Sequence, residues 1–190
     1  SKLRGAMNKA LSLTQEELDR GIVCASSGNH AQGVACAAHR LGARAVIVMP
    51  TNANPVKLAG VKAFGGQVEL VGTLGSQREG RAAQLVEQEG MVNVHPYADP
   101  YVAAGQGTIG LEIIEDQPAL DAVAVPIGGG GLISGVATAV KGLAPQVKTI
   151  GVEPAGADRY ARSRAAGQPV TLDKVDTIAD GTRRDHATLF

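Results

Sequence analysis

Short runs of β-branched and other apolar residues alternate along this chain with longer stretches whose apolar residues recur at helical spacing. This alternation is typical of βαβ units, in which consecutive strands pair in parallel and the intervening helices cover the sheet. Right-handed crossovers between such strands give a layered architecture. The pattern predicts an α/β fold with mainly parallel sheets, with strands over residues 21–25, 45–49, 67–71, 92–95, 122–126 and 148–153 and helices over residues 29–41, 54–64, 76–88, 103–116, 132–143 and 157–166.

The organisation of the chain changes near Ala98-Asp99-Pro100. Closely spaced strand–helix units precede this point, whereas a long helix, a glycine run and two further units follow it. We therefore expect two lobes with a cleft between them, which is where α/β proteins place ligands. Thr14 and Glu17 have the spacing of a capping box, so the helical segment before the first strand is expected to be broken.

The composition argues against several classes of partner. Lys+Arg and Asp+Glu are both 18 and there is no Trp, so nucleic acid, which selects basic surfaces and aromatic stacking platforms, is not an expected partner. No apolar run has the length of roughly 18 residues that a membrane-spanning helix needs. Cys24 and Cys36 lie in apolar runs and are predicted to be buried free thiols, so a cytoplasmic location is expected.

Four consecutive glycines, Gly128 to Gly131, join a predicted strand to a predicted helix. Glycine costs conformational entropy, so such a run indicates a place where the backbone must approach something closely. Backbone N–H groups at a helix N-terminus bind anions, which favours a phosphate site over a simple tight turn. The spacing of small residues does not fit a dinucleotide fingerprint, and no Gly-Lys-Ser/Thr follows, so a P-loop is excluded.

Two further segments carry side chains that could bind a ligand or take part in catalysis. Ser26-Ser27-Gly28-Asn29-His30 joins the first predicted strand to a helix, and its side chains and amides could grip a carboxylate, although Ser and Asn are also ordinary helix caps. Lys2 lies near the start of the chain, where a lysine is commonly a solvated charge. Together with the glycine run, these features are the parts that pyridoxal phosphate (PLP) chemistry requires.

The chain resembles the fold-type II PLP enzymes, which share the fold of the tryptophan synthase β-subunit, and specifically their serine/threonine dehydratase (threonine ammonia-lyase) and serine racemase branch. The likeness covers nearly the whole chain and rests on motifs in the same order: Lys2–Ala6, Ser26–His30, Ala104–Glu112, Gly128–Leu132 and Asp176–Gly181. It implies two three-layer α/β/α lobes, with residues 21–98 in a small lobe and residues 1–20 and 99–190 in an incomplete large lobe. It also implies a homodimer or a higher homo-oligomer.

The resemblance implies a role for each matching residue. Lys2 would be the Schiff-base lysine and the base that removes the α-proton, with Ser27 as the acid or base of the opposite face. Asn29 would bind the ring hydroxyl of the cofactor. The cofactor phosphate would lie on the glycine run and the residue after it, and the substrate carboxylate on the serine-rich turn: Gly128, Gly129, Gly130, Gly131 and Leu132 for the phosphate, and Ser26, Ser27, Asn29 and His30 for the carboxylate.

Three departures from the family pattern are visible. A phenylalanine that the family has between serine and lysine is missing between Ser1 and Lys2, and segments at both ends of the family's chain are absent, so we expect a fragment. Some relatives bind a divalent metal ion at the stretch that matches Glu153 to Arg159, where Glu153 and the Ala157 carbonyl fit but Arg159 replaces an acid. Asp158 could supply the acidic ligand instead, but a surface pair of Asp158 with Arg159 is the simpler interpretation, so no metal is expected.

The expected reaction is a β-elimination that converts L-threonine or L-serine, a small hydroxy-amino acid, into 2-oxobutanoate or pyruvate and ammonia. Serine racemisation with the same cofactor is one alternative. A truncated, noncatalytic protein that binds phosphate or a nucleotide through the glycine run is another.

Overall fold

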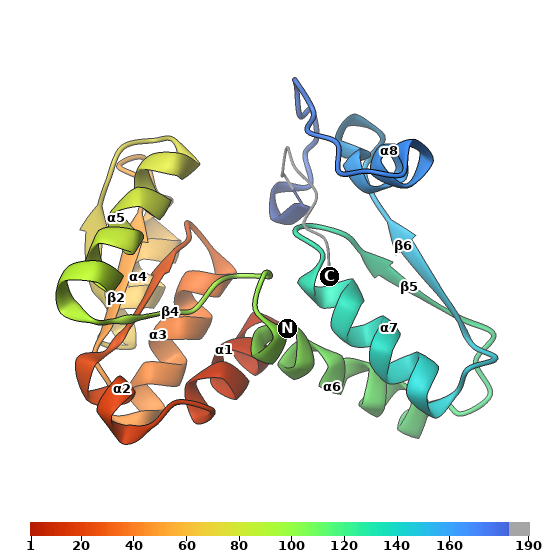
Figure 1. Ribbon diagram of the computed structural model, residues 1–190, viewed down its shortest axis with the longest axis horizontal. Helices are drawn as coiled ribbons and strands as arrows, with labels where there is room; N and C mark the ends of the chain where they lie inside the picture. Colours follow the sequence, from red (N-terminus) through yellow and green to blue (C-terminus); the bar gives the residue numbers. More distant parts are fainter. Residues whose placement is uncertain (183–190) are drawn as a thin grey trace. The chain divides into compact units, whose positions relative to one another are not determined.

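The computed structural model describes residues 1–182 (Figure 1). It divides into two compact units, which we call unit 1 (Ser1–Gly105) and unit 2 (Gln106–Phe190). The boundary falls inside a single helix, α6 (Pro100–Asp116). Residues 183–190 of the expected large lobe lie outside the described residues.

Unit 1 contains a four-stranded parallel sheet. The strands lie in the order β3-β2-β1-β4, and β1 is central, pairing with β2 from Ile22↔Ala45 onward and with β4 from Ile22↔Val92. The predicted parallel sheet is therefore confirmed for this half of the chain, with its strands at β1 (Ile22–Ala25), β2 (Ala45–Met49), β3 (Gln67–Leu70) and β4 (Val92–Asn93).

Helices cover both faces of this sheet. Side chains alternate between the faces of a strand, so Ile47 faces a core that includes Val34 of α3 (Asn29–Leu41) and Val61 of α4 (Pro55–Ala63). Val46 and Val48 point the other way and pack against Leu85 of α5 (Gly75–Glu89). Unit 1 is thus an α/β/α sandwich, as expected for a lobe of this fold.

The segment before β1 is broken into two helices, as predicted: α1 (Lys2–Leu11) and α2 (Gln15–Arg20). Thr14 and Glu17 form the expected capping box, with Thr14 N–H donating to the Glu17 carboxylate at 2.8 Å and Glu17 N–H donating to Thr14 Oγ1 at 3.2 Å. α1 packs against α3, because Gly33 presents only backbone there: a Cβ on Gly33 would lie 3.1 Å from Leu3 N. The assignment of residues 1–20 to the large lobe of the whole enzyme stays a prediction.

Unit 2 is built around a two-stranded parallel sheet of β5 (Ala122–Pro126) and β6 (Lys148–Val152). Val123 and Val125 face α7 (Gly131–Leu143), where Val136 and Val140 complete a small core. Further along are a 3₁₀ turn, η1 (Ala155–Ala157), the short helix α8 (Arg159–Ala166) and a second turn, η2 (Asp180–Thr182).

Only one face of the second sheet is packed in the part of the chain that the structure describes. Ile150 and Val152 on the other face are each 49% exposed. The three-layer arrangement expected for both lobes is therefore present in unit 1, whereas unit 2 shows a two-layer portion of it. None of the helices in residues 1–182 combines the length and the hydropathy of a membrane span.

Candidate active site

The turn between β1 and α3 carries the serine-rich motif. Ser26 N–H donates to the carbonyl oxygen of Val48 at 3.1 Å, which ties the turn to the neighbouring strand. Gly28 is the N-cap of α3 and supplies no side-chain hydrogen bond, and the first turn of the helix holds no acidic residue. Because the N-terminus of a helix carries partial positive charge, this turn suits a carboxylate or a phenolate oxygen.

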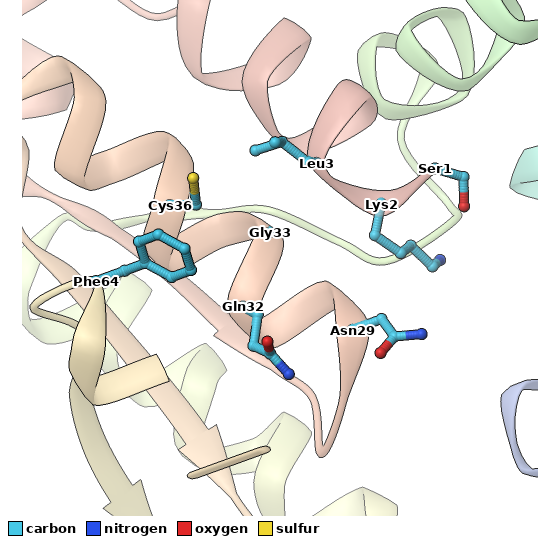
Figure 2. Close-up of a pocket in the computed structure, with 8 residues that line it drawn as sticks. All are labelled: Ser1, Lys2, Leu3, Asn29, Gln32, Gly33, Cys36 and Phe64. Carbon is cyan, nitrogen blue, oxygen red and sulfur yellow. The ribbon is translucent and has the colours of Figure 1, made fainter. Parts of the chain in front are cut away.

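Lys2 lies at the start of α1, and its ammonium nitrogen donates to the carbonyl oxygen of Pro96 at 2.5 Å. Lys2 lines a pocket of about 300 Å³ together with Asn29 of the serine-rich turn. In Figure 2, Ser1, Lys2 and Asn29 lie at one end of this pocket, and Cys36 and Phe64 lie at the other. Two residues that the sequence separates by a strand and two helices are therefore brought to one cavity.

The loop that holds the Pro96 carbonyl is fixed by its own side chains. His95 Nδ1 accepts hydrogen bonds from Tyr97 N–H at 3.3 Å and Ala98 N–H at 2.8 Å, and the His95 and Tyr97 rings meet edge-on, 4.6 Å apart. Asp99 caps the start of α6 by accepting from Val102 N–H at 3.0 Å. This loop could not be predicted as part of the site, since nothing in the sequence pairs it with Lys2.

His30 is buried, and its Nε2 lies 2.7 Å from the carbonyl oxygen of Val94. A carbonyl oxygen only accepts hydrogen bonds, so Nε2 must carry the proton of this pair. The ring therefore links α3 to the end of β4.

Lys57 of α4 is a further neighbour of the serine-rich turn, and it carries no sequence signal that links it to this turn. A Cβ built on Gly28 would lie 3.5 Å from Lys57 Nζ, so this ammonium group comes close to the turn. A cation there adds to the preference of the turn for an anion.

The glycine run of unit 2 forms the turn between β5 and α7. Gly130 is the N-cap of α7 with φ +96°, a left-handed conformation that favours glycine. The first turn of α7 has neither a side-chain cap nor an acidic residue. A Cβ on Gly128 would lie 3.2 Å from the carbonyl oxygen of Gly181, so the structure brings the Asp176–Gly181 motif against the run.

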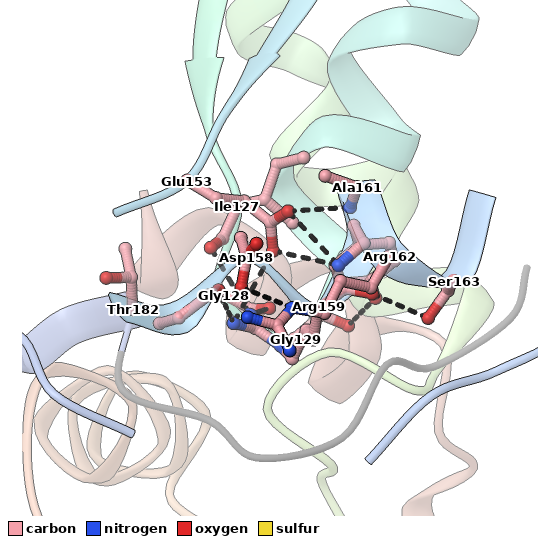
Figure 3. A network of polar contacts seen from close by, with 12 residues as sticks. Ile127, Gly128, Gly129, Glu153, Asp158, Arg159, Ala161, Arg162, Ser163 and Thr182 are labelled. Carbon is pink, nitrogen blue, oxygen red and sulfur yellow. Dashed lines mark hydrogen bonds and ion pairs between the residues drawn. The ribbon is translucent and has the colours of Figure 1, made fainter. Parts of the chain in front are cut away.

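The carbonyl groups of this run are held by side chains of α8. Arg159 Nη2 donates to the carbonyl oxygens of Ile127, at 3.3 Å, and of Gly128 (Figure 3). The Tyr160 hydroxyl donates to the carbonyl oxygen of Gly129 at 3.0 Å. Each of these contacts lies within unit 2. Hydrogen bonds from α8 therefore fix the orientation of these peptide carbonyls.

The prediction that Arg159 forms a surface ion pair with Asp158 is wrong. Its side chain is fully buried and its Nη1 lies 3.5 Å from the Glu153 carboxylate and 3.0 Å from the Ala157 carbonyl oxygen. Asp158 pairs instead with Arg162 at 2.9 Å, an exposed contact that lowers the pKa of the Asp158 carboxyl. The oxygens considered for a metal ion therefore surround a guanidinium, and no cluster of potential metal ligands occurs in residues 1–182.

Comparison with known proteins gives a consistent result. The family described as "Pyridoxal-phosphate dependent enzyme" matches residues 1–189. The chain is 49% identical over 180 residues to a threonine dehydratase 2 of Solanum lycopersicum, covering 95% of this chain and 30% of the relative. It is 48% identical over 180 residues to an L-threonine ammonia-lyase of Thermotoga maritima, covering 95% and 45%. A serine racemase of Oryza sativa subsp. indica is 44% identical over 182 residues, covering 96% and 54%.

Solved structures agree with the sequence comparison. The processed form of threonine deaminase isoform 2 from Solanum lycopersicum has a TM-score of 0.94 at 48% identity, covering 98% of this chain and 51% of that chain. Maize serine racemase has a TM-score of 0.95 at 43% identity, covering 98% and 56%. The chain spans about half or less of the length of these relatives. By its sequence and its fold, the chain belongs to the family of pyridoxal-phosphate-dependent enzymes, within fold type II.

Proposed function

We propose that the whole protein catalyses the PLP-dependent β-elimination of L-threonine or L-serine. The products are 2-oxobutanoate or pyruvate and ammonia. The observation that carries this proposal is the pocket that Lys2 shares with Asn29. An amine that joins the cofactor aldehyde and an amide that binds the neighbouring ring hydroxyl must lie close together. Relatives named threonine dehydratase and L-threonine ammonia-lyase support this choice of reaction.

The residues present fit the cofactor. A pocket of about 300 Å³ is of the size that small-molecule sites have, and it presents the Lys2 amine. The turn at Gly128 to Gly131 opens a helix whose first turn has no side-chain cap, which suits the phosphate. Leu132 follows in the same first turn. When bound, PLP acts as an electron sink for the carbon that loses its proton.

Lys2 is proposed as the base that removes this α-proton. Its hydrogen bond to the Pro96 carbonyl fixes the direction of one N–H, so the nitrogen lone pair of the neutral amine is directed elsewhere. Because His95 and Asp99 hold the Pro96 loop, the amine is positioned by rigid backbone. Such positioning supplies a large share of catalysis in proton transfer.

The serine-rich turn is proposed to hold the substrate carboxylate. Ser26 and Ser27 offer hydroxyls and Asn29 offers an amide. The backbone N–H groups in the first turn of α3, including that of His30, face the helix N-terminus, which favours an anion. Lys57 adds positive charge near this turn. Holding the carboxylate fixes the rotation of the substrate and hence the direction of its Cα–H bond.

Racemisation of serine is the second candidate. Its support is the 44% identity to a rice serine racemase and the exposed position of Ser27 on the turn, from which it could deliver a proton.

We also propose that the protein is cytoplasmic and forms a homodimer or a higher homo-oligomer. In the whole enzyme, residues 21–98 would form the small lobe, and residues 1–20 and 99–190 would belong to the large lobe.

The test is product formation by the full-length protein supplied with PLP. L-threonine and L-serine should give keto acid and ammonia in equal amounts. Lys2→Ala should abolish both products, whereas Lys62→Ala, which changes an exposed lysine on α4 of the same unit, should retain them. Production of D-serine without keto acid would favour the racemase. A protein that takes up PLP but yields none of these products would contradict both candidates.

A further inference from the structure

Arg159 is the only arginine in the described part of the chain that is fully buried. Its guanidinium contacts oxygens of four residues, namely the Glu153 carboxylate and the carbonyls of Ala157, Ile127 and Gly128. Figure 3 shows it at the centre of this polar network. Burying a charge is costly unless it is paired and hydrogen-bonded, so these oxygens are the reason that the guanidinium can lie here.

Two side chains of α8 bind three consecutive peptide carbonyls, those of Ile127 and of the first two glycines of the run. We call Arg159 and Tyr160 the α8 clamp. Arg159 binds the carbonyls of Ile127 and Gly128, and Tyr160 binds that of Gly129. In a trans peptide the N–H group points opposite to the carbonyl, and the described chain has no cis peptide bond.

The clamp therefore fixes the direction of the N–H groups as well. With the carbonyls of residues 127–129 turned toward α8, the N–H groups of Gly128, Gly129 and Gly130 are turned away from α8. Glycine by itself would leave these peptides free to rotate. A carbonyl that accepts a bond from a cation also makes the N–H of its own peptide a stronger donor.

We infer that Arg159 is a positioning residue for the phosphate of the cofactor: it orients and polarises the peptides of the glycine run so that their N–H groups bind the phosphate. This inference rests on the proposed function, which places the phosphate at Gly128 to Gly131. Glu153 completes the arrangement, since its carboxylate also accepts from the N–H groups of Tyr160 and Ala161 and so fixes α8.

The test compares PLP with pyridoxal, which lacks the phosphate. Dissociation constants of both are measured for the full-length apoprotein by absorbance or fluorescence titration. Arg159→Ala should weaken PLP by about tenfold or more, the scale of a lost charge-assisted contact, and leave pyridoxal within about twofold. Arg159→Lys, which keeps the charge but cannot reach all the oxygens at once, should fall between Arg159→Ala and the native protein.

The matched control is Arg162→Ala. Arg162 lies on the same helix, but its side chain is 60% exposed and pairs only with Asp158 among the contacts that the structure gives it. It should change neither dissociation constant. If Arg159→Ala does not fold, Arg159→Lys gives the same comparison with a smaller perturbation.

The outcomes separate the inference from the proposed function. If the native protein prefers PLP over pyridoxal and the Arg159 variants keep that preference, the role of Arg159 is refuted and the phosphate site remains. If the variants weaken both compounds equally, Arg159 is merely structural and the inference again fails. If the native protein binds the two compounds equally, the phosphate site itself is wrong, and the inference falls with it.

Discussion

The ammonium nitrogen of Lys2 lies 2.5 Å from the carbonyl oxygen of Pro96, a contact between residues 94 positions apart in the chain. It joins the first turn of α1 to the loop that follows β4, and the side chains of that loop hold the carbonyl in place. The proposed base is therefore positioned by the backbone of unit 1. Substitutions that move α1 should lower kcat.

Gly33 sets the distance between α1 and α3. A Cβ at this position would lie 3.1 to 3.3 Å from the backbone of Lys2 and Leu3, so Gly33→Ala should push the start of α1 outward by a few tenths of an ångström. We expect kcat to fall by roughly tenfold with a smaller change in KM, because a displacement of about 1 Å can cost 10²-fold. Gly80→Ala, on α5 with nothing within 4 Å, is the control and should leave kcat unchanged.

Gly130 combines a left-handed backbone with the N-cap position of α7. Gly130→Ala should destabilise the protein by about 1 to 3 kcal/mol and weaken PLP binding, because a Cβ disfavours this conformation. Gly142→Ala, in the last turn of the same helix with open space around it, should instead be neutral or stabilise by up to about 1 kcal/mol. Urea unfolding and PLP titration measure both effects, and equal behaviour of the two variants would contradict this account of the turn.

Divalent cations should have no effect on cofactor binding. The Glu153 carboxylate and the Ala157 carbonyl already contact the Arg159 guanidinium, and a second cation among these groups would be repelled. Dialysis against EDTA, or addition of Mg²⁺ or Ca²⁺, should leave the PLP dissociation constant within about twofold of its starting value. A larger change that Mg²⁺ reverses would show that the guanidinium does not fill this site.

Cys24 should be unreactive in the folded protein and should limit stability at alkaline pH. Burial raises the pKa of its thiol from 9.0 to about 12, because the thiolate would be desolvated. The unfolded chain therefore releases this proton first, so the stabilisation is complete below about pH 9 and is lost as the pH rises toward 12. Urea unfolding as a function of pH should show this loss for the native protein and less of it for Cys24→Ala, and iodoacetamide at pH 8 should leave Cys24 unmodified.

Much of unit 1 could be predicted from the sequence because its strands and helices carry strong local signals. The strand at Ala45–Met49 and the helix at Asn29–Leu41 have the predicted bounds, since a β-branched run and a glycine C-cap mark them. β4 is shorter than predicted because the chain turns at His95 and Pro96. The helix predicted over residues 157–166 begins at Arg159, because Ala155–Ala157 forms a 3₁₀ turn.

The candidate site was less predictable, since its decisive contacts join distant segments. The glycine run and the serine-rich turn are visible as motifs, but Pro96 and Lys57 carry no signal that links them to those motifs. The prediction for Arg159 was wrong for a physical reason. An arginine next to an aspartate usually forms a surface pair, and here its burial depends on the Glu153 carboxylate and on carbonyls that include those of Ile127 and Gly128, about 30 residues earlier in the chain.

The most direct test of the account is the identity of the lysine that joins the cofactor. The full-length holoenzyme is reduced with borohydride, digested, and analysed by mass spectrometry for the peptide that carries the pyridoxyl phosphate. We predict a single modified residue, Lys2. Modification of another lysine, or none in a protein that has bound PLP, would contradict the proposed active site.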